Sequence, residues 1–212
     1  METNSKQYQK ITFIIFIFST FILTPTFSQT FGEEAKELEL NGHEIGVGAG
    51  FSSGVGLTYR KWNGVNGIQF TLTPILEKEN TYLSAGVTLY KTIKESSSHK
   101  FNLYLGNHYL LNTGNYSYEW TDSFNNITYS DSNNSSDKHW IIGSGVAFEL
   151  LPGVGRFSVN FLVGLGADIS WNEYSNESRE NNQITFSQST KTSDYRVGPV
   201  GGIFFFYRLG AN

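Results

Sequence analysis

The feature that most constrains the fold is a repeated two-residue alternation of apolar with small or polar side chains. In one segment, Phe157 and Phe161 alternate with Ser158 and Asn160. Because successive side chains of a β-strand point to opposite faces, such a pattern predicts a strand with one apolar face. Eight segments have it: Glu44–Phe51, Val55–Trp62, Gly67–Leu76, Tyr82–Lys91, Lys100–Leu110, His139–Leu150, Arg156–Ile169 and Tyr195–Leu209.

The lengths and second faces of these segments favour a membrane barrel. Tilted transmembrane strands need about 9–11 residues, and faces of Gly, Ser, Thr and Asn suit the crowded interior of eight strands. A soluble sandwich would alternate in the same way with its apolar face inward. We therefore predict an all-β, antiparallel, up-and-down transmembrane β-barrel of eight strands over residues 44–212. Strand pairing inside the long loops would raise the count to ten.

The connections between the segments differ in length in a regular way. The two longest, residues 111–138 and 170–194, leave from the same end of an up-and-down meander, as extracellular loops do. Both are rich in Asn, Ser, Thr and Tyr, a mixture suited to binding a protein or a glycan. Exposed loops are also simply polar and variable. Alternation within them, as in Tyr116, Tyr118 and Trp120, indicates hairpins that extend above the membrane.

Residues 1–28 are predicted to be a cleaved signal peptide. Two lysines precede the apolar run Ile11–Leu23, and small residues precede Gln29. The run is short for a membrane anchor, and Pro25 follows it. Residues 29–43 form a polar lead. Export of this kind, together with the predicted barrel, leads us to expect the mature chain in the outer membrane of a Gram-negative bacterium.

Composition excludes several functions. Fifteen basic and nineteen acidic residues give a net charge of −4, without the basic patch that nucleic acid requires. There is no cysteine, which excludes disulfides, thiolate nucleophiles and cysteine metal sites. No phosphate-binding loop or dinucleotide fingerprint occurs, and we expect no cofactor.

Charged residues on the predicted inward faces form three candidate pairs. An ion path is one interpretation, but eight strands leave no aqueous channel, and buried ions need partners. We therefore predict a structural salt-bridge network in the lumen. Its members are Glu44 with Arg60, Glu149 with Arg156, and Asp168 with Arg196.

Large aromatic residues near strand ends are predicted to form interfacial girdles, as in membrane barrels. The alternative is the general preference of aromatic residues for strands. The predicted girdle residues are Trp62 and Tyr90 at the short-turn end, and Tyr109, Trp140 and Trp171 at the long-loop end.

Two weak constellations lie near the long-loop end. His108 and His139, with Asp137, could begin a metal site, but their spacing is not that of a ligand set, and we predict no metal. A Ser-His-acid site from Ser144, His108 and Glu149 would place Ser144 and Glu149 on opposite faces of one strand. We therefore predict no catalytic residues.

The signal peptide, the segment Gly54–Trp62 and the aromatic last strand resemble those of small outer-membrane β-barrel families. The chain is similar to the transmembrane domain of outer-membrane protein A and resembles outer-membrane barrels of Bacteroidetes bacteria over residues 43–209. The resemblance implies contact with outer-membrane lipid and insertion by the barrel-assembly machinery. It differs at the end, where Leu209-Gly210-Ala211-Asn212 replaces a terminal aromatic residue, so Phe205 and Tyr207 would carry the insertion signal.

Three functional hypotheses follow. The first is a non-enzymatic outer-membrane barrel with a structural or surface-interaction role through its long extracellular loops. The second is an envelope- or lipid-modifying barrel enzyme. The third is a soluble exported, lipocalin-like binding protein, whose inward face should be apolar.

Overall fold

The computed structural model describes residues 42–77, 79–124, 127–151, 156–181 and 183–209. The chain divides into two units, residues 1–38 and 39–212, and every described residue belongs to the second. The predicted signal peptide and almost all of the predicted polar lead therefore lie outside the described residues. In the described part of the chain, no helix is long and apolar enough to cross a membrane.

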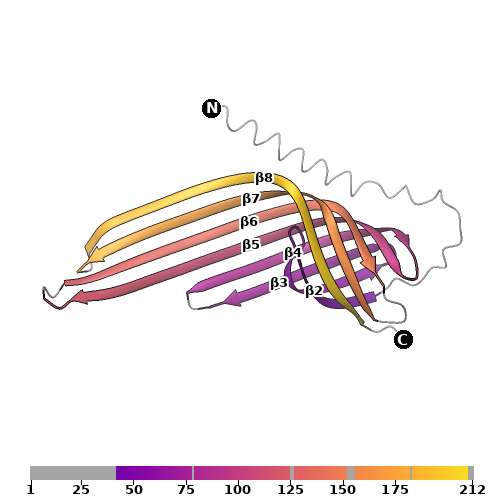
Figure 1. Ribbon diagram of the computed structural model, residues 1–212, viewed down its shortest axis with the longest axis horizontal. Coiled ribbons are helices and arrows are strands. Elements are labelled where there is room, and N and C mark those ends of the chain that lie inside the picture. The colour runs from indigo at the N-terminus through magenta and orange to yellow at the C-terminus, as the bar shows by residue number, and fades with distance from the viewer. Residues whose placement is uncertain (1–41, 78, 125–126, 152–155, 182, 210–212) are drawn as a thin grey trace, which may run out of the picture. The chain divides into compact units, whose positions relative to one another are not determined.

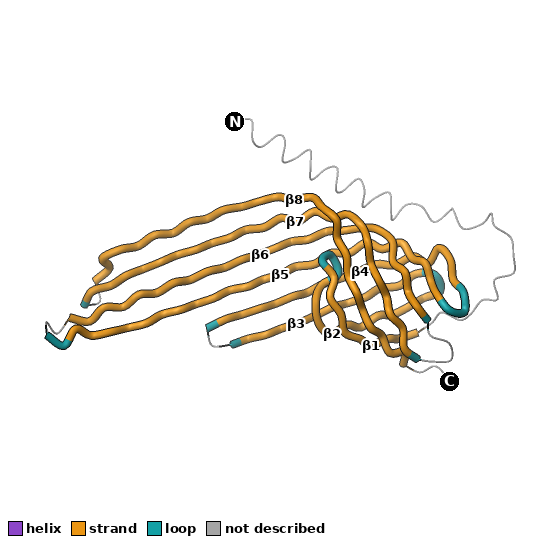
Figure 2. Tube along the Cα trace, in the orientation of Figure 1, coloured by secondary structure: helices purple, strands orange, loops and turns teal. Residues whose placement is uncertain are grey.

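Eight antiparallel strands make up the described residues. Each strand pairs with the next in sequence, and β1 also pairs with β8, so one sheet closes into a ring (Figures 1 and 2). The prediction of an all-β meander of eight strands is confirmed, and no ninth or tenth strand occurs among the residues described. The strands are β1 (Gly42–Gly50), β2 (Gly54–Asn63), β3 (Asn66–Leu76), β4 (Asn80–Glu95), β5 (His99–Asp122), β6 (Ile127–Leu150), β7 (Phe157–Glu180) and β8 (Gln183–Leu209).

The register of β1 places charged residues of three strands in one row. Glu44 is the Cα partner of Arg60 on β2 and of Arg208 on β8. Directly opposed residues of neighbouring strands have side chains on the same face of a sheet. Closure of the ring therefore brings an acidic and two basic side chains together near one end.

Strands β5 to β8 continue well beyond the ring as an open four-stranded sheet (Figure 1). The last partner of β5 on β4 is at Gly114, paired with Asn80, and the last partner of β8 on β1 is at Gly202, paired with Gly50. We call residues 112–138 and 171–193 the extension; its first rows, at Asn112 to Gly114, still pair with β4. Where they are described, the segments expected to be long loops are mainly strands, which agrees with the hairpins that their alternation indicates.

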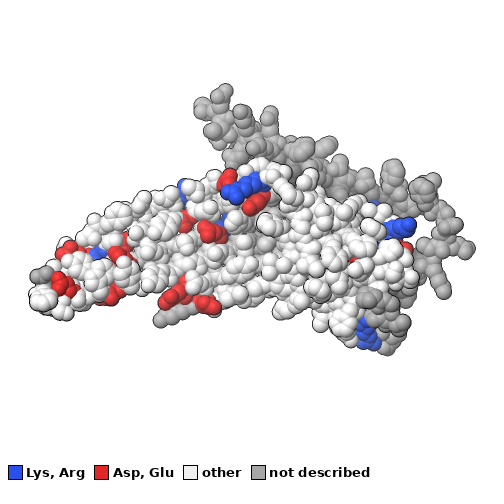
Figure 3. Space-filling view, viewed as in Figure 1, with Lys and Arg blue, Asp and Glu red and all other residues white. Residues whose placement is uncertain are grey.

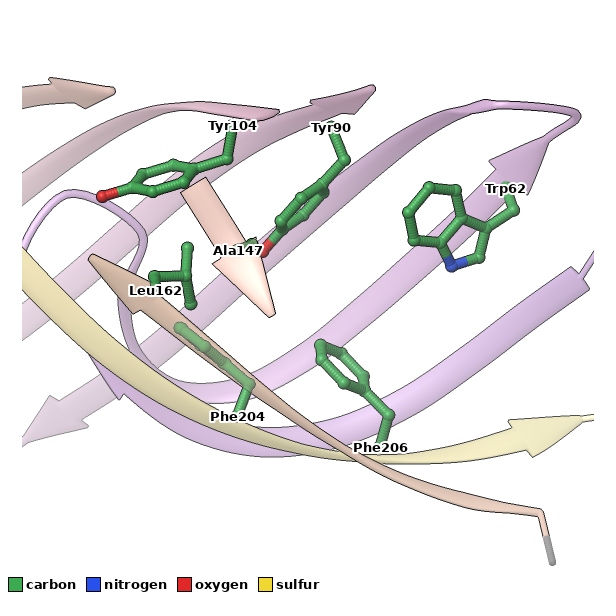
Figure 4. Packing of buried hydrophobic residues seen from close by; sticks show 7 residues of the cluster. All are labelled: Trp62, Tyr90, Tyr104, Ala147, Leu162, Phe204 and Phe206. Atoms are coloured by element: carbon green, nitrogen blue, oxygen red, sulfur yellow. The ribbon is translucent and has the colours of Figure 1, made fainter. Parts of the chain in front are cut away.

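The two faces of the ring differ sharply in chemistry. Apolar side chains point outward and are exposed, as with Leu57 (71%), Val163 (64%) and Leu165 (66%). The interior buries polar and charged residues, including Arg60, Lys100 and Glu149, each with 0% exposure. A cluster of mostly aromatic residues also lies in the interior (Figure 4). This cluster consists of Trp62, Tyr90, Tyr104, Ala147, Leu162, Phe204 and Phe206.

Candidate functional site

Arg60 is the centre of an ionic network inside the ring. Its Nε donates to Glu44 Oε2 at 2.6 Å, and one terminal nitrogen donates to Glu149 Oε1 from across the ring. The three side chains are at most 2% exposed. Lys100 Nζ lies 3.3 Å from Glu95 Oε1, and Arg208 Nε lies 3.4 Å from Glu44 Oε1. The network joins β1, β2, β4, β5, β6 and β8 at one end of the ring.

Aromatic rings surround the same guanidinium. The Arg60 guanidinium carbon lies 3.7 Å from the ring centroid of Phe206 and 5.1 Å from that of Trp62. Trp62 Nε1 donates to Glu44 Oε2 at 3.2 Å, and Lys100 Nζ lies 4.8 Å from the Trp62 ring centroid. Cations held over aromatic faces away from water gain from the negative charge of the ring face. The arrangement stabilises paired ions in a closed interior.

The structure places the three predicted charge pairs differently. Glu44 and Arg60 meet as expected, but Glu149 also contacts Arg60, while Arg156 precedes β7 and is exposed. Glu149 and Arg156 were expected to pair because they flank one turn. The Glu149 carboxylate instead points into the ring, where it contacts Arg60.

Asp168 and Arg196 are Cα partners on β7 and β8, but their side chains bind elsewhere. Asp168 Oδ1 lies 3.1 Å from His139 Nδ1, and Arg196 Nε donates to Asp194 Oδ2 at 2.7 Å. The Arg196 side chain is 79% exposed. At this level β8 has already lost its partner β1, so a long side chain can reach water.

The predicted aromatic girdle is wrong for two residues. Trp62 and Tyr90 are 2% and 3% exposed and belong to the interior cluster (Figure 4). Both share the inward alternation of their strands, with Arg60 and Thr88, so position near a strand end did not decide their orientation. Tyr109, Trp140 and Trp171 lie on outward positions, with Trp140 41% and Trp171 40% exposed.

The other end of the interior is filled by the turn between β1 and β2, Phe51–Ser53, which we call the inner turn. Ser52 and Ser53 are 3% and 1% exposed. A Cβ at Gly106 would lie 2.4 Å from the Ser52 carbonyl oxygen, and one at Gly86 would lie 2.2 Å from the Ser53 carbonyl oxygen. Glycine at these two positions lets the turn pack against β4 and β5.

His108 and Ser84 bind the inner turn to the ring wall. Ser84 Oγ accepts from the Val55 amide at 2.9 Å and lies 2.9 Å from His108 Nε2. His108 Nδ1 lies 2.8 Å from the Phe51 carbonyl oxygen. A nucleophilic serine would need access and an acid to orient its histidine, but Ser84 is fully buried and the histidine faces a carbonyl. The pair anchors the turn.

The structure does not bring together the residues of the two weak constellations near the long-loop end. His139 binds Asp168, and Asp137 lies in a different row, opposite Asn112 and Asn172. No group of three His, Cys, Asp or Glu residues that could hold a metal occurs in the described ranges. In the Ser-His-acid constellation that the sequence argued against, Ser144 and Glu149 are five residues apart on β6 and thus on opposite faces.

The extension has an aromatic face, on the side continuous with the ring interior. Tyr118 stacks on Trp120 at 5.3 Å between ring centroids, and Trp120 stacks on Tyr129 at 5.2 Å. The Tyr118 hydroxyl donates to Asp131 Oδ2 at 2.8 Å. Hydrogen bonds from Ser178 and Tyr118 hold the pKa of Asp131 below its usual value. The aromatic stack therefore lies beside a carboxylate that stays charged.

Comparison with known proteins adds no family: no family model matches this chain, and no curated protein matches it.

Three features of the interior were missed by the sequence interpretation. Lys100 has the inward alternation of Asn102 and Tyr104 and could have been included in the predicted network. The Ser84–His108 contact required knowledge of the β4–β5 register, in which His108 pairs with Gly86. The inward fold of the inner turn had only one indirect signal, the glycines at inward positions of the neighbouring strands.

Proposed function

We propose that this chain is an outer-membrane β-barrel of a Gram-negative bacterium that acts through its surface-exposed extension and not as an enzyme. The observation that carries the proposal is the inverted distribution of side chains. Charged groups are buried inside the ring, as with Arg60 at 0% exposure, while Leu57 is 71% exposed outside it. A ring of this kind needs an apolar solvent around it.

The distribution of charge along the outer face supports the same proposal. Among the described residues, the outward positions between Lys61 and Lys91 at one end and Lys138 at the other carry no Asp, Glu, Lys or Arg. In the face that Figure 3 shows, charged side chains gather over the extension, and the surface of the ring is largely uncharged. Monomeric soluble proteins rarely expose so continuous an apolar surface.

The two alternatives have less support. A lipocalin-like protein would line its interior with apolar groups for a ligand, whereas this interior holds an ionic network and the inner turn. A barrel enzyme would need an accessible nucleophile, and Ser84, which contacts His108 beside the inner turn, has 0% exposure.

The test uses the absence of native cysteine. Val163→Cys would place a thiol on the outer face of the ring, and Ser189→Cys would place one on the extension, where Ser189 is exposed. In intact cells, a membrane-impermeant maleimide should label Ser189→Cys and not Val163→Cys. Both should react after denaturation.

A heat-dependent shift of the outer-membrane fraction on SDS gels should accompany this labelling pattern. Equal labelling of both positions in a soluble fraction, with no heat-dependent shift, would contradict the proposal. In that case the exposed apolar face would have to be covered by something other than lipid.

A further inference from the structure

The basic residues described in the extension all lie on one of its two faces, whereas its acidic residues lie on both. Opposed residues in each row share a face, and the rows Tyr118–Asp131–Ser178 and Trp120–Tyr129–Glu180 define the aromatic face. Its carboxylates are Asp122, Asp131, Asp137 and Glu180, and none of its described residues within the extension is Lys or Arg.

The opposite face of the extension is electrically balanced. The cations among the described residues of the extension, Lys138, Arg179 and Lys191, all have the alternation of this face. Lys191 Nζ donates to Glu173 Oε1 at 3.1 Å, and Arg179 binds Glu177. Glu173 and Glu177 therefore have cationic partners on their own face, whereas Asp131, Asp137 and Glu180 share the aromatic face with no Lys or Arg among the described residues of the extension.

The aromatic face also offers a large contact surface. Tyr116, Tyr118 and Trp120 are 59%, 46% and 44% exposed, and Tyr174 is held by a hydrogen bond from its hydroxyl to Asn133 Oδ1 at 3.1 Å. Stacked rings have few rotamers left to lose on binding. Aromatic side chains held in this way, with amides around them, are typical of surfaces that bind proteins.

We propose that the aromatic face binds a basic polypeptide segment, rich in Arg and Lys, of a partner protein at the cell surface. The proposal rests on the proposed function, which exposes the extension to the medium. Guanidinium and ammonium groups are attracted both to aromatic rings and to carboxylates. Asp131, Asp137 and Glu180 supply the complementary charge, and the aromatic stack supplies the buried area. An anionic glycan would be repelled by the same carboxylates.

The experiment measures binding of a fluorescein-labelled peptide of alternating Arg and Ser to the purified full chain in non-ionic detergent, by anisotropy. Asp131→Asn with Glu180→Gln removes two charges from the aromatic face, and Glu173→Gln with Glu177→Gln removes two from the opposite face. We expect the first double variant to weaken binding by about ten-fold or more and the second by less than about two-fold. Trp120→Ala should also weaken binding, although it changes no charge.

Three results would overturn the proposal: equal weakening by both double variants, which indicates general electrostatics; binding of a neutral oligosaccharide and not of the peptide; or no effect of Trp120→Ala. A heat-dependent gel shift, measured on the same preparation, tests the membrane proposal separately from the proposal of a basic partner. A shift without peptide binding contradicts only the partner assignment. Peptide binding without a shift contradicts the membrane proposal and leaves the chemistry of the face in place.

Discussion

At the scale of single residues, the Arg60 guanidinium has the most consequential position in the interior. It contacts carboxylates of β1 and β6 and lies over the ring of Phe206. Removing one partner of a buried ion pair leaves the other charged and unsolvated, which costs far more than the pair contributes. The stability of the ring should therefore depend on this one side chain more than on the exposed ion pairs of the extension.

Arg60→Met is expected to lower the free energy of unfolding by about 3–5 kcal/mol, because Glu44 and Glu149 lose their shared partner. Guanidinium chloride unfolding in detergent, followed by tryptophan fluorescence, measures the change. Arg196→Met, which removes an exposed pair with Asp194, is the control and should have little effect.

Neutralising the two carboxylates should restore part of the loss. The triple variant Arg60→Met, Glu44→Gln, Glu149→Gln removes the two carboxylate charges that Arg60→Met leaves without their partner, so it should be more stable than Arg60→Met alone. If Arg60→Met and Arg196→Met unfold at the same denaturant concentration, the network has no structural role.

At the scale of elements, the inner turn closes the end of the ring opposite the Arg60 network. It is held by His108 and Ser84 and packs on strand positions where any side chain would collide with its backbone. Both ends of the interior are thus filled by the protein itself, one by ions and aromatic rings and the other by main chain.

Gly106→Val is expected to displace the inner turn, because the new Cβ would meet the Ser52 carbonyl oxygen at 2.4 Å. Overpacking of this kind costs about 1–3 kcal/mol. The displacement can be followed with a thiol introduced by Ser53→Cys, at a position that is 1% exposed. This thiol should be protected from maleimide when it is the only substitution, and it should be labelled when Gly106→Val is also present.

Gly198→Val is the matched control, since a Cβ at Gly198 would meet no atom within 4 Å. It should leave Ser53→Cys protected. Protection that persists in the Gly106→Val background would mean that the turn can move within the interior without leaving it, and the anchoring by His108 would then need another explanation.

At the scale of the whole molecule, the pairing that closes the ring does not involve the outer part of the extension. The pairing of β1 with β8 ends at the row Gly50–Gly202, and the pairing of β4 with β5 ends at the row Asn80–Gly114. Beyond those rows, the rest of the extension is a mostly exposed ladder of Asn, Ser, Thr and Tyr. Closure of the sheet therefore does not need the outer parts of the two long hairpins.

Replacing residues 115–134 and 175–189 with Asn-Gly turns should leave the ring folded, because the cuts fall on one row, Asn115–Asn134–Ser175–Ser189. The heat-dependent gel shift of the proposed barrel should be retained and binding of the Arg-Ser peptide lost. A trimmed chain that fails to fold would show that the extension takes part in closure.

Much of the architecture could be predicted because it depends on local alternation. The eight strands, the outward apolar faces and the Glu44–Arg60 row follow from a period of two residues combined with short turns. The orientation of Trp62 and Tyr90 was also within reach, since their alternation matches that of Arg60 and Thr88. The girdle prediction failed for them because residue type was given more weight than strand position.

What the sequence by itself determined is the face on which each side chain lies, because alternation in a strand is a local property of the backbone. Only the tertiary structure decided which inward groups meet. Arg60 is hydrogen-bonded to Glu149, which lies 89 positions away in the chain. His108 contacts the carbonyl of Phe51, which lies 57 positions away. Such contacts depend on ring closure and on the register of several strands at once, which no local pattern specifies.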